Sequence, residues 1–342
     1  MDAAEMLQLA NETPFVATLS LIPDIQGVDT LYIVLKATFV LGEAPTVADP
    51  QQPLHLADEC WGEPGASSLK YVAELHPTKS ATDVVLVGSA HAPNGRPVTM
   101  MDTRLTVGRL RKRVRVVGDR VYSGRLLGAT LDAARPFTTM PLVYERAFGG
   151  VHVIDAEKGK IKAEEANPVG RGFRAEKRRQ ELKGTLAPNL LDPVDAERPA
   201  GYGFIAPHWQ PRRGYAGSYD AAWERERAPY LPADFDPRFF NAANPDLVAD
   251  GYLQGGEPVE LAHLSPHGRL SFVLPRCRFD LAVRLGSATQ QPAFNLETVL
   301  FEPDDERFSM LWRAAVPCDK KALEVEKVSL KLRELVFDGR LA

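Results

Sequence analysis

The sequence predicts a mainly β protein, in which antiparallel sheets form a β-sandwich-like scaffold with a long, ordered, loop-rich middle and few short helices. Both ends of the chain contain short segments rich in β-branched and aromatic residues, bounded by Gly, Pro, Asn and Asp. The stretch from Asn167 to Pro245 has almost no helical or strand periodicity. Long helices do not alternate with strands, so a sheet built from βαβ units is not expected.

The strands expected in the first third have one face in water. Arg113-Val114-Arg115-Val116 alternates charged and apolar residues, which is typical of a half-solvated strand and favours antiparallel sheets. Pro93-Asn94-Gly95-Arg96 predicts a hairpin turn between the strands on either side of it. The expected strands lie at residues 30–41, 83–90, 98–102, 113–116 and 121–122.

The final third repeats this pattern. Pro303-Asp304-Asp305 predicts a hairpin connection between two of its strands. Residues 321–337 contain helix formers, but the alternation over 325–332 favours a strand with Leu330, Leu332 and Val328 facing inward. The other expected strands lie at residues 269–274, 280–285, 296–302 and 307–312.

Helix signals are few. Residues 3–10 predict a short N-terminal turn, residues 175–183 a helix ending at Gly184, and residues 237–243 a single turn. The chain is therefore divided into an N-terminal β region (1–140), a loop-rich recognition segment (141–255) and a C-terminal β region (256–342). The last region is expected either to stand alone or to form one domain with the first.

Composition narrows the class of protein. The net charge of -4 argues against a general nucleic-acid binder, which normally carries a basic excess. Three widely spaced cysteines leave one unpaired in any disulfide scheme and suit a reducing compartment. The first twenty residues do not resemble a signal peptide, and no apolar run is long enough for a membrane span. We expect a cytoplasmic protein that binds neither nucleic acid nor membrane.

Catalytic and metal-binding patterns are weak. His263 and His267 have the spacing of two helical zinc ligands, but Pro266 between them breaks a helix, and there is no CxxC pair. The chain contains no G-x-S-x-G nucleophile motif, and Gly170-Arg171-Gly172 lacks the context of a phosphate-binding loop. We therefore expect a protein that is not an enzyme and has no catalytic residue, metal or cofactor.

The loop-rich middle is the strongest candidate for a binding surface. Residues 167–245 contain 11 of the 28 aromatic residues and 10 of the 27 prolines of the chain. Aromatic-rich loops are usually ordered, and Trp, Tyr and Arg are enriched among interface hot spots. About half of these aromatics are expected to pack inward on the β core. The candidate protein-binding residues are Arg171, Phe173, Trp209, Arg212, Tyr219, Trp223, Arg227, Asp234, Arg238 and Phe239.

A carbohydrate-directed function is the alternative. Loop carboxylates lie among aromatic residues that are suited to stacking on sugars, as in a carbohydrate or cell-wall binding module or a glycoside hydrolase. In loops, however, Asp-Pro and Asp-Phe are usually cap and turn residues. The carboxylates concerned are Asp220, Glu224, Asp234 and Asp236.

Several ordered motifs resemble one bacterial family, domain of unknown function 2169. The resemblance covers nearly the whole chain and is densest between residues 144 and 246. The motifs are YERAFGG (144–150), NPVGRGF (167–173), PNLLDP (188–193), GYGFIAPHWQPR (201–212), AGSYDAAW (216–223), LPADFDPRFFNAANPD (231–246) and EPDDERFSMLWR (302–313).

The resemblance implies a role in type VI secretion, the contractile injection machine of Gram-negative bacteria. It implies a cytoplasmic adaptor or chaperone that binds an effector, or its PAAR-repeat tip domain, and assists loading onto the spike. The partners that the resemblance implies are thus the effector, the tip protein or both, with the spike protein as a further candidate. Within that role, Arg171 and Arg227 are expected to pair cargo carboxylates, and Trp209 and Trp223 to act as anchors.

Overall fold

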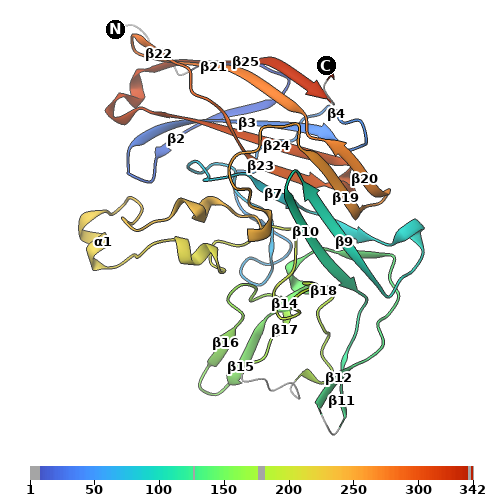
Figure 1. Cartoon of the computed structure of the whole chain (residues 1–342). Helices are drawn as coiled ribbons and strands as arrows, with labels where there is room; N and C mark the ends of the chain where they lie inside the picture. The colour runs from blue at the N-terminus through green and yellow to red at the C-terminus, as the bar shows by residue number, and fades with distance from the viewer. Residues whose placement is uncertain (1–7, 126–127, 176–181, 338–339, 342) are drawn as a thin grey trace.

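A computed structural model describes residues 8–125, 128–175, 182–337 and 340–341. Three sheets and several two-stranded pairs make up most of its regular structure (Figure 1). The central sheet has the order β2-β3-β24-β23-β7, with β4 beside β3. Its strands are β2 (Val16–Pro23), β3 (Asp29–Val40), β4 (Thr46–Val47), β7 (Asp83–Leu86), β23 (Asn295–Glu302) and β24 (Arg307–Pro317).

A second sheet, here called the top sheet, stacks on the central one. Its strands are β1 (Gln8–Glu12), β21 (Arg276–Leu285), β22 (Ala288–Gln290), β25 (Val325–Phe337) and β26 (Arg340–Leu341). Ring contacts join the two sheets, with Phe279 at 5.2 Å from Trp312 and Phe337 at 6.0 Å from Phe39 between ring centroids. The layered pair accounts for the sandwich-like character that the strand alternation predicts.

A third sheet, the side sheet, packs beside the central one. Its order is β18-β10-β9-β19-β20. The ring of Phe272 lies 5.3 Å from Phe308 and 6.2 Å from Phe301, which joins the side sheet to the central sheet. The strands are β9 (Met100–Val107), β10 (Leu110–Val117), β18 (Leu190–Leu191), β19 (Pro258–Ser265) and β20 (Gly268–Val273).

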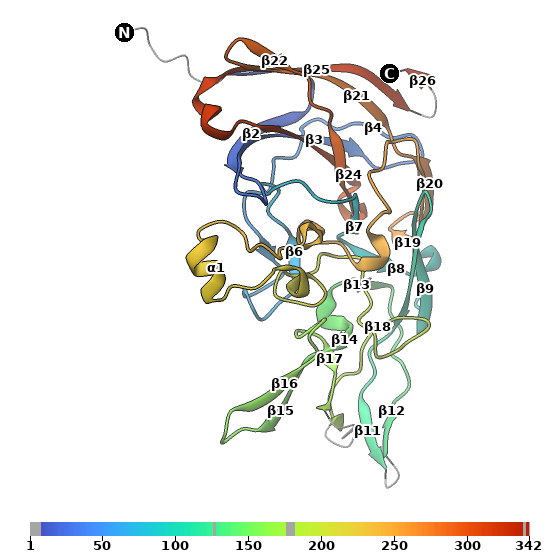
Figure 2. The ribbon, with the colours of Figure 1, turned by 60° about the vertical axis from the view of Figure 1, so that its left-hand side comes forward.

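Short strand pairs extend from this body. Two of them, β11/β12 and β15/β16, project away from the sheets in both ribbon views (Figure 2). The pairs are β5 (Glu59–Cys60) with β6 (Leu69–Tyr71), β8 (Ser89–His91) with β13 (Thr139–Pro141), β11 (Tyr122–Arg125) with β12 (Gly128–Leu131), β14 (Phe148–Gly149) with β17 (Arg171–Gly172), and β15 (Val151–Asp155) with β16 (Lys160–Ala163).

Helical structure is scarce in the described residues. The one α-helix, α1 (Ala221–Glu226), is accompanied by short 3-10 turns. These turns lie at Pro93–Gly95, Tyr144–Arg146, Arg212–Tyr215, Pro237–Phe240, Pro245–Leu247, Pro303–Asp305 and Asp319–Glu324. The predicted fold class, mainly β with antiparallel sheets, is confirmed.

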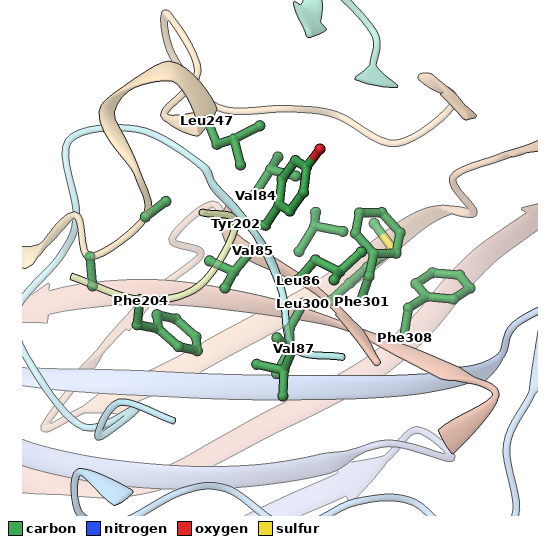
Figure 3. Packing of buried hydrophobic residues seen from close by; sticks show 14 of the residues in the cluster. Val84, Val85, Leu86, Val87, Tyr202, Phe204, Leu247, Leu300, Phe301 and Phe308 are labelled. Atoms are coloured by element: carbon green, nitrogen blue, oxygen red, sulfur yellow. The ribbon is translucent and has the colours of Figure 1, made fainter. Parts of the chain in front are cut away.

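The core draws on the loop-rich middle as well as on the sheets. Tyr202, Phe204 and Leu247 lie around the short strand β7, in the same buried cluster as Phe301 and Phe308 of the central sheet (Figure 3). All of these side chains are at most 2% exposed. Since each such burial contributes about 1.5–3 kcal/mol, the middle segment is held by the same hydrophobic effect as the sheets.

Most of the strands predicted from the sequence are confirmed, and so is the hairpin at Pro303–Asp305. Strand β25 is also confirmed, with Val328 and Leu330 buried and Leu332 half-buried. The turn at Pro93–Gly95 also forms, with Asn94 at φ 54°. The predicted hairpin pairing around it is wrong, because β8 pairs with β13, and Val98 bridges Phe137. A local turn signal does not fix which distant segment completes a ladder.

The helix predictions fared less well. Residues 8–10 of the predicted N-terminal turn form part of β1, and residues 3–7 lie outside the described residues. The predicted helix at 175–183 likewise falls mostly outside them. The turn at 237–243 is confirmed as the 3-10 turn Pro237–Phe240, whereas α1 was not predicted.

Candidate protein interface

The motifs of the middle segment meet around one buried residue, Tyr144. The side-chain amide of Asn167 donates to the backbone oxygen of Tyr144 at 2.8 Å, and the ring of Trp209 lies edge-on at 5.7 Å. A side chain on Gly201 would lie 2.9 Å from the Tyr144 ring, so only glycine fits there. Asn244 donates to the Tyr144 hydroxyl at 3.4 Å. These motif residues therefore build the interior of the middle segment.

A buried polar network ties this interior to the central sheet. The Asp83 carboxylate accepts from the ammonium of Lys79 at 2.7 Å, from the side chain of Asn241 at 2.9 Å and from the backbone NH of Ala242 at 2.8 Å. Lys79 also donates to Thr298 on β23. Both charged partners are buried, so the pair is stable only while every donor and acceptor is satisfied.

Trp209 and Arg212 face inward as part of this arrangement. Trp209 is fully buried, and its indole NH donates to His208 at 3.0 Å. The Arg212 guanidinium donates to the backbone oxygens of Ile205 at 2.6 Å and Phe239 at 2.9 Å. Burial lowers the pKa of Arg212. In this structure both residues support the loop and neither is presented to a partner.

Beyond Arg212 the chain leaves the body and forms a projecting lobe, here called the outer lobe (residues 213–240). It carries α1 at its tip and extends to one side in both ribbon views (Figures 1 and 2). Within residues 213–240, all of which are described, there is no strand. The lobe is therefore held by side-chain contacts and turns, not by a ladder of backbone hydrogen bonds.

Hydrogen bonds across the neck of the outer lobe fix its path. Asp234 accepts from the backbone NH of Ser218 at 2.9 Å and from its hydroxyl at 2.8 Å. These hydrogen bonds lower the pKa of Asp234. Gly217 has φ +76°, and a side chain there would lie 2.9 Å from Asp234, so the position requires glycine.

The tip of the outer lobe presents aromatic residues. The side chain of Asp220 caps α1 by accepting from the backbone NH groups of Ala222 and Trp223. The ring of Trp223 packs edge-on against Tyr219 at 4.8 Å, and its indole NH donates to the backbone oxygen of Tyr230 at 2.8 Å. Tyr219 is 55% exposed and Tyr230 is 42% exposed. The cluster is thus ordered internally while two of its rings face solvent.

Arg227 and Tyr230 dock the outer lobe on the loop between β2 and β3. The Arg227 guanidinium donates to the backbone oxygens of Ile25 at 3.2 Å and Gln26 at 3.3 Å. The Tyr230 ring covers Gly27, whose φ is +89° and where a side chain would approach that ring to 3.0 Å. This contact joins residues that are about two hundred positions apart and limits how far the lobe can swing.

The base of the outer lobe is an aromatic cluster. Phe239 lies 5.5 Å from Phe235 and 5.9 Å from Phe240, and Phe240 stacks on His76 at 5.6 Å. At the rim, Arg238 is exposed and forms a salt bridge with Asp236. Of the predicted binding residues, Tyr219, Trp223, Arg227, Asp234, Arg238 and Phe239 therefore belong to one structural unit.

Arg171 and Phe173 lie elsewhere, near the projecting hairpins. The half-buried Arg171 donates from Nε to the backbone oxygen of Glu145 at 2.8 Å, and burial lowers its pKa. Phe173 packs edge-on against Phe148 at 6.4 Å and lines a hollow of about 420 Å³ together with Arg120 and Tyr122. These two residues are separate from the outer lobe, so the predicted set does not form a single surface.

The carboxylates considered for sugar chemistry have structural partners. Asp220 caps α1, Asp234 holds Ser218, and Asp236 caps the 3-10 turn and binds Arg238. Among the described residues, no group of three or more His, Cys, Asp or Glu side chains is arranged to hold a metal ion. No helix in the described part of the chain has the length and apolar character needed to cross a membrane.

Two features of the outer lobe escaped the sequence analysis. Tyr230 was not among the predicted binding residues, although it is exposed and fixes the lobe on Gly27. Helix α1 was also missed. The signal for the helix was present, because Asp220 precedes the helix-forming run Ala-Ala-Trp-Glu-Arg-Glu as a capping residue.

Comparison with known proteins places this architecture in a bacterial family. Neither the comparison with curated proteins nor that with solved structures gave a match. A family model described as an uncharacterized protein conserved in bacteria (DUF2169) matches residues 26–313. That range includes the side sheet, the central sheet apart from β2 and the end of β24, the Tyr144 interior and the whole outer lobe. Because the match covers most of the 342 residues, the chain belongs to the DUF2169 family.

Proposed function

We propose that this protein is a non-enzymatic cytoplasmic adaptor or chaperone of the type VI secretion system. It binds an effector, or the effector's PAAR-repeat tip domain, and assists loading onto the spike. The observation that carries the proposal is the outer lobe, which exposes Tyr219 and Tyr230 on an ordered projection. Amphipathic rings of this kind supply contact area at a low cost in conformational entropy.

The construction of the lobe supports a binding role. Arg227 and Tyr230 fix the lobe on the body, so little ordering is needed when a partner binds. Two exposed arginines accompany the aromatic residues of the lobe. Arg225 on α1 pairs with Glu226, and Arg238 at the base of the lobe pairs with Asp236. Such exposed pairs exchange partners at small cost, which suits a complex that forms and later releases its cargo.

Co-purification tests the proposal. The tagged protein is co-expressed with each PAAR-repeat tip protein and each toxin encoded in the source genome. We expect one of them to purify with the wild type. Tyr219→Ala combined with Tyr230→Ala should weaken that complex at least tenfold, since loss of a hot-spot ring costs about 2 kcal/mol or more.

Trp61→Ala is the matched control, because Trp61 is an exposed ring (43%) directly after β5, outside the lobe. Its loss should leave the complex intact. Absence of a complex with every tip protein and toxin would reject the adaptor function. A shift of the tryptophan fluorescence on adding cell-wall polysaccharide, abolished by the Tyr219/Tyr230 double variant, would instead establish the carbohydrate-binding function.

A further inference from the structure

The side sheet carries a concentration of arginines on its solvent face. Along β9 and β10 the buried residues alternate with outward ones, as expected for strands that cover a core on one side. The buried set includes Thr103, Leu105 and Val114, which face the Tyr202 side of the sheet. The outward charged residues are Asp102, Arg104, Arg111, Arg113, Arg115, Glu260 and Arg269.

The strand register places like charges side by side. Arg113 on β10 lies directly opposite Arg104 on β9, and Ala262 on β19 separates Arg104 from Arg269 on β20. One rung of the sheet therefore carries three guanidinium groups. Like charges in directly opposite positions destabilise a sheet. The row of three guanidinium groups therefore does not stabilise the side sheet by itself.

The carboxylates on this face are too few to neutralise it. Asp102 binds Arg115 at 2.8 Å and lies 3.9 Å from Arg113. Glu260 pairs with Arg104 and also lies 3.1 Å from Arg269. Five arginines thus share two carboxylates, which leaves three positive charges, and no ion pair to Arg111 exists within the described part of the chain. The excess is local, since the whole chain has a net charge of -4.

A hollow adjoins the arginines at the β10 edge. It measures about 660 Å³ and is lined by Arg111, Arg113, Asp246 and the exposed Val194, among others. The two carboxylates that line the hollow have other partners: Asp246 is bound by Lys112 at 2.8 Å and Arg198 at 2.7 Å, and Asp192 lies 3.6 Å from Arg198. The hollow therefore offers guanidinium groups with free donors next to an apolar contact.

We propose that the arginine face of the side sheet, centred on Arg111 and Arg113, binds a carboxylate-rich polypeptide segment. Guanidinium groups match carboxylates with paired hydrogen bonds, and a sheet face with an adjacent hollow accommodates an extended peptide. The face lies on the opposite side of the body from α1 (Figures 1 and 2). It is therefore a second interaction surface, and the proposal does not depend on the function of the outer lobe.

Peptide is favoured over nucleic acid on two grounds. None of the outward positions of strands β9, β10, β19 and β20 holds a Phe, Tyr or Trp on which a base could stack. The carboxylates of Asp102 and Glu260 remain within the face and repel a continuous phosphate backbone. A peptide with separate acidic side chains can instead place its carboxylates on the arginines and avoid Asp102 and Glu260.

The test uses a fluorescein-labelled oligo-glutamate peptide, an oligo-glutamine peptide of equal length and a single-stranded DNA of equal charge. Fluorescence anisotropy is measured on the full chain at low and raised salt. We expect salt-sensitive binding of oligo-glutamate alone, weakened about fivefold by Arg111→Gln combined with Arg113→Gln, since two exposed ion pairs are lost.

The control is Arg278→Gln combined with Arg333→Gln. It removes two exposed arginines from the top sheet and changes the net charge equally. Equal weakening by both double variants, or tighter binding of DNA than of oligo-glutamate, would overturn the proposal. Thermal melting provides a second readout. Arg113→Gln should keep or raise the melting temperature, because it relieves the repulsion between Arg113 and Arg104. A clear decrease in the melting temperature would contradict the argument from like charges.

Discussion

The inner part of the middle segment (residues 188–212 and 241–247) and the outer lobe both contain aromatic residues and arginines, but they place them in different environments. Trp209 in the inner part is fully buried, whereas Tyr219 in the outer lobe is 55% exposed. Arg212 is enclosed by backbone oxygens, while Arg238 lies in solvent beside one carboxylate. Residue type alone therefore does not decide whether such a segment builds a core or a surface. The tertiary neighbours of each side chain decide it, as Tyr144 does for Trp209.

The comparison predicts that the two tryptophans respond differently to truncation. Trp209→Ala should lower the free energy of unfolding by about 3–5 kcal/mol, because it leaves a cavity against Tyr144 in the interior. Trp223→Ala should lower it by about 1 kcal/mol or less, since its ring packs mainly within the lobe. Urea denaturation followed by circular dichroism measures both. Similar losses for the two variants would show that the lobe unfolds together with the body.

The buried carboxylate at Asp83 offers a second way to separate the regions. Asp83→Ala should cost about 3 kcal/mol or more, because the buried ammonium of Lys79 loses its counter-charge and Asn241 loses an acceptor. Asp234→Ala in the outer lobe is the matched variant, since it removes a carboxylate with two hydrogen bonds at an exposed site. Urea denaturation measures both variants. If Asp234→Ala lowered the free energy of unfolding as much as Asp83→Ala does, the outer lobe would not be energetically separate from the body.

Loss of the Arg227 contact should affect the lobe without unfolding the body. Arg227→Ala removes the hydrogen bonds to Ile25 and Gln26 and should raise the open fraction of the lobe about fivefold, since solvent screens a half-buried guanidinium. Hydrogen exchange of residues 213–240 measures this opening. Arg225→Ala, which removes an exposed arginine of α1 that pairs with Glu226, should leave the exchange unchanged.

Acid should affect the body of the protein and the outer lobe in different pH windows. Burial lowers the pKa of His76 well below its usual value, and the charges of Arg313 and Lys79 add to the effect. Below about pH 6.5 the His76 ring therefore binds a proton in the unfolded chain but not in the folded chain. The free energy of unfolding is thus highest above about pH 6.5 with respect to this group and decreases as the pH falls below it. His76→Gln should flatten this decrease in denaturation curves between neutral and mildly acidic pH.

In the outer lobe the relevant group is Asp234, whose pKa is lowered by the Ser218 hydrogen bonds. Its contribution is present above the ordinary carboxyl pKa of about 4 and is lost only as the pH falls further. Hydrogen exchange of residues 218–234, away from the contact of Phe240 with His76, should therefore stay constant through the window in which His76 acts. Opening of the lobe near pH 6 would contradict this assignment.

Local sequence signals predicted much of the fold. The alternation at Arg113–Val116 and the Pro-Asp-Asp turn at 303–305 each depend on residues within a few positions, and both are confirmed. The pairing of β7 with β23 is parallel and joins residues more than two hundred positions apart, so no local pattern specifies it. The aromatic content of the middle segment identified an ordered region. It did not separate Trp209 from Tyr219, because burial depends on the tertiary neighbours of each ring.

The central sheet has a consequence for how the chain is made. Strand β3 is buried at ten of its twelve positions, yet its neighbour β24 and the partner of β7, strand β23, come from residues 295–317. A nascent chain leaves the ribosome from its N-terminus. Strand β3 can pair early with β2, but the other edge of β3 and the strand β7 wait for most of translation before their partners emerge. Folding that relies on such distant contacts is slow, and the waiting strands are open to aggregation. A cell that makes this protein therefore benefits from a trigger factor or similar holdase on the growing chain.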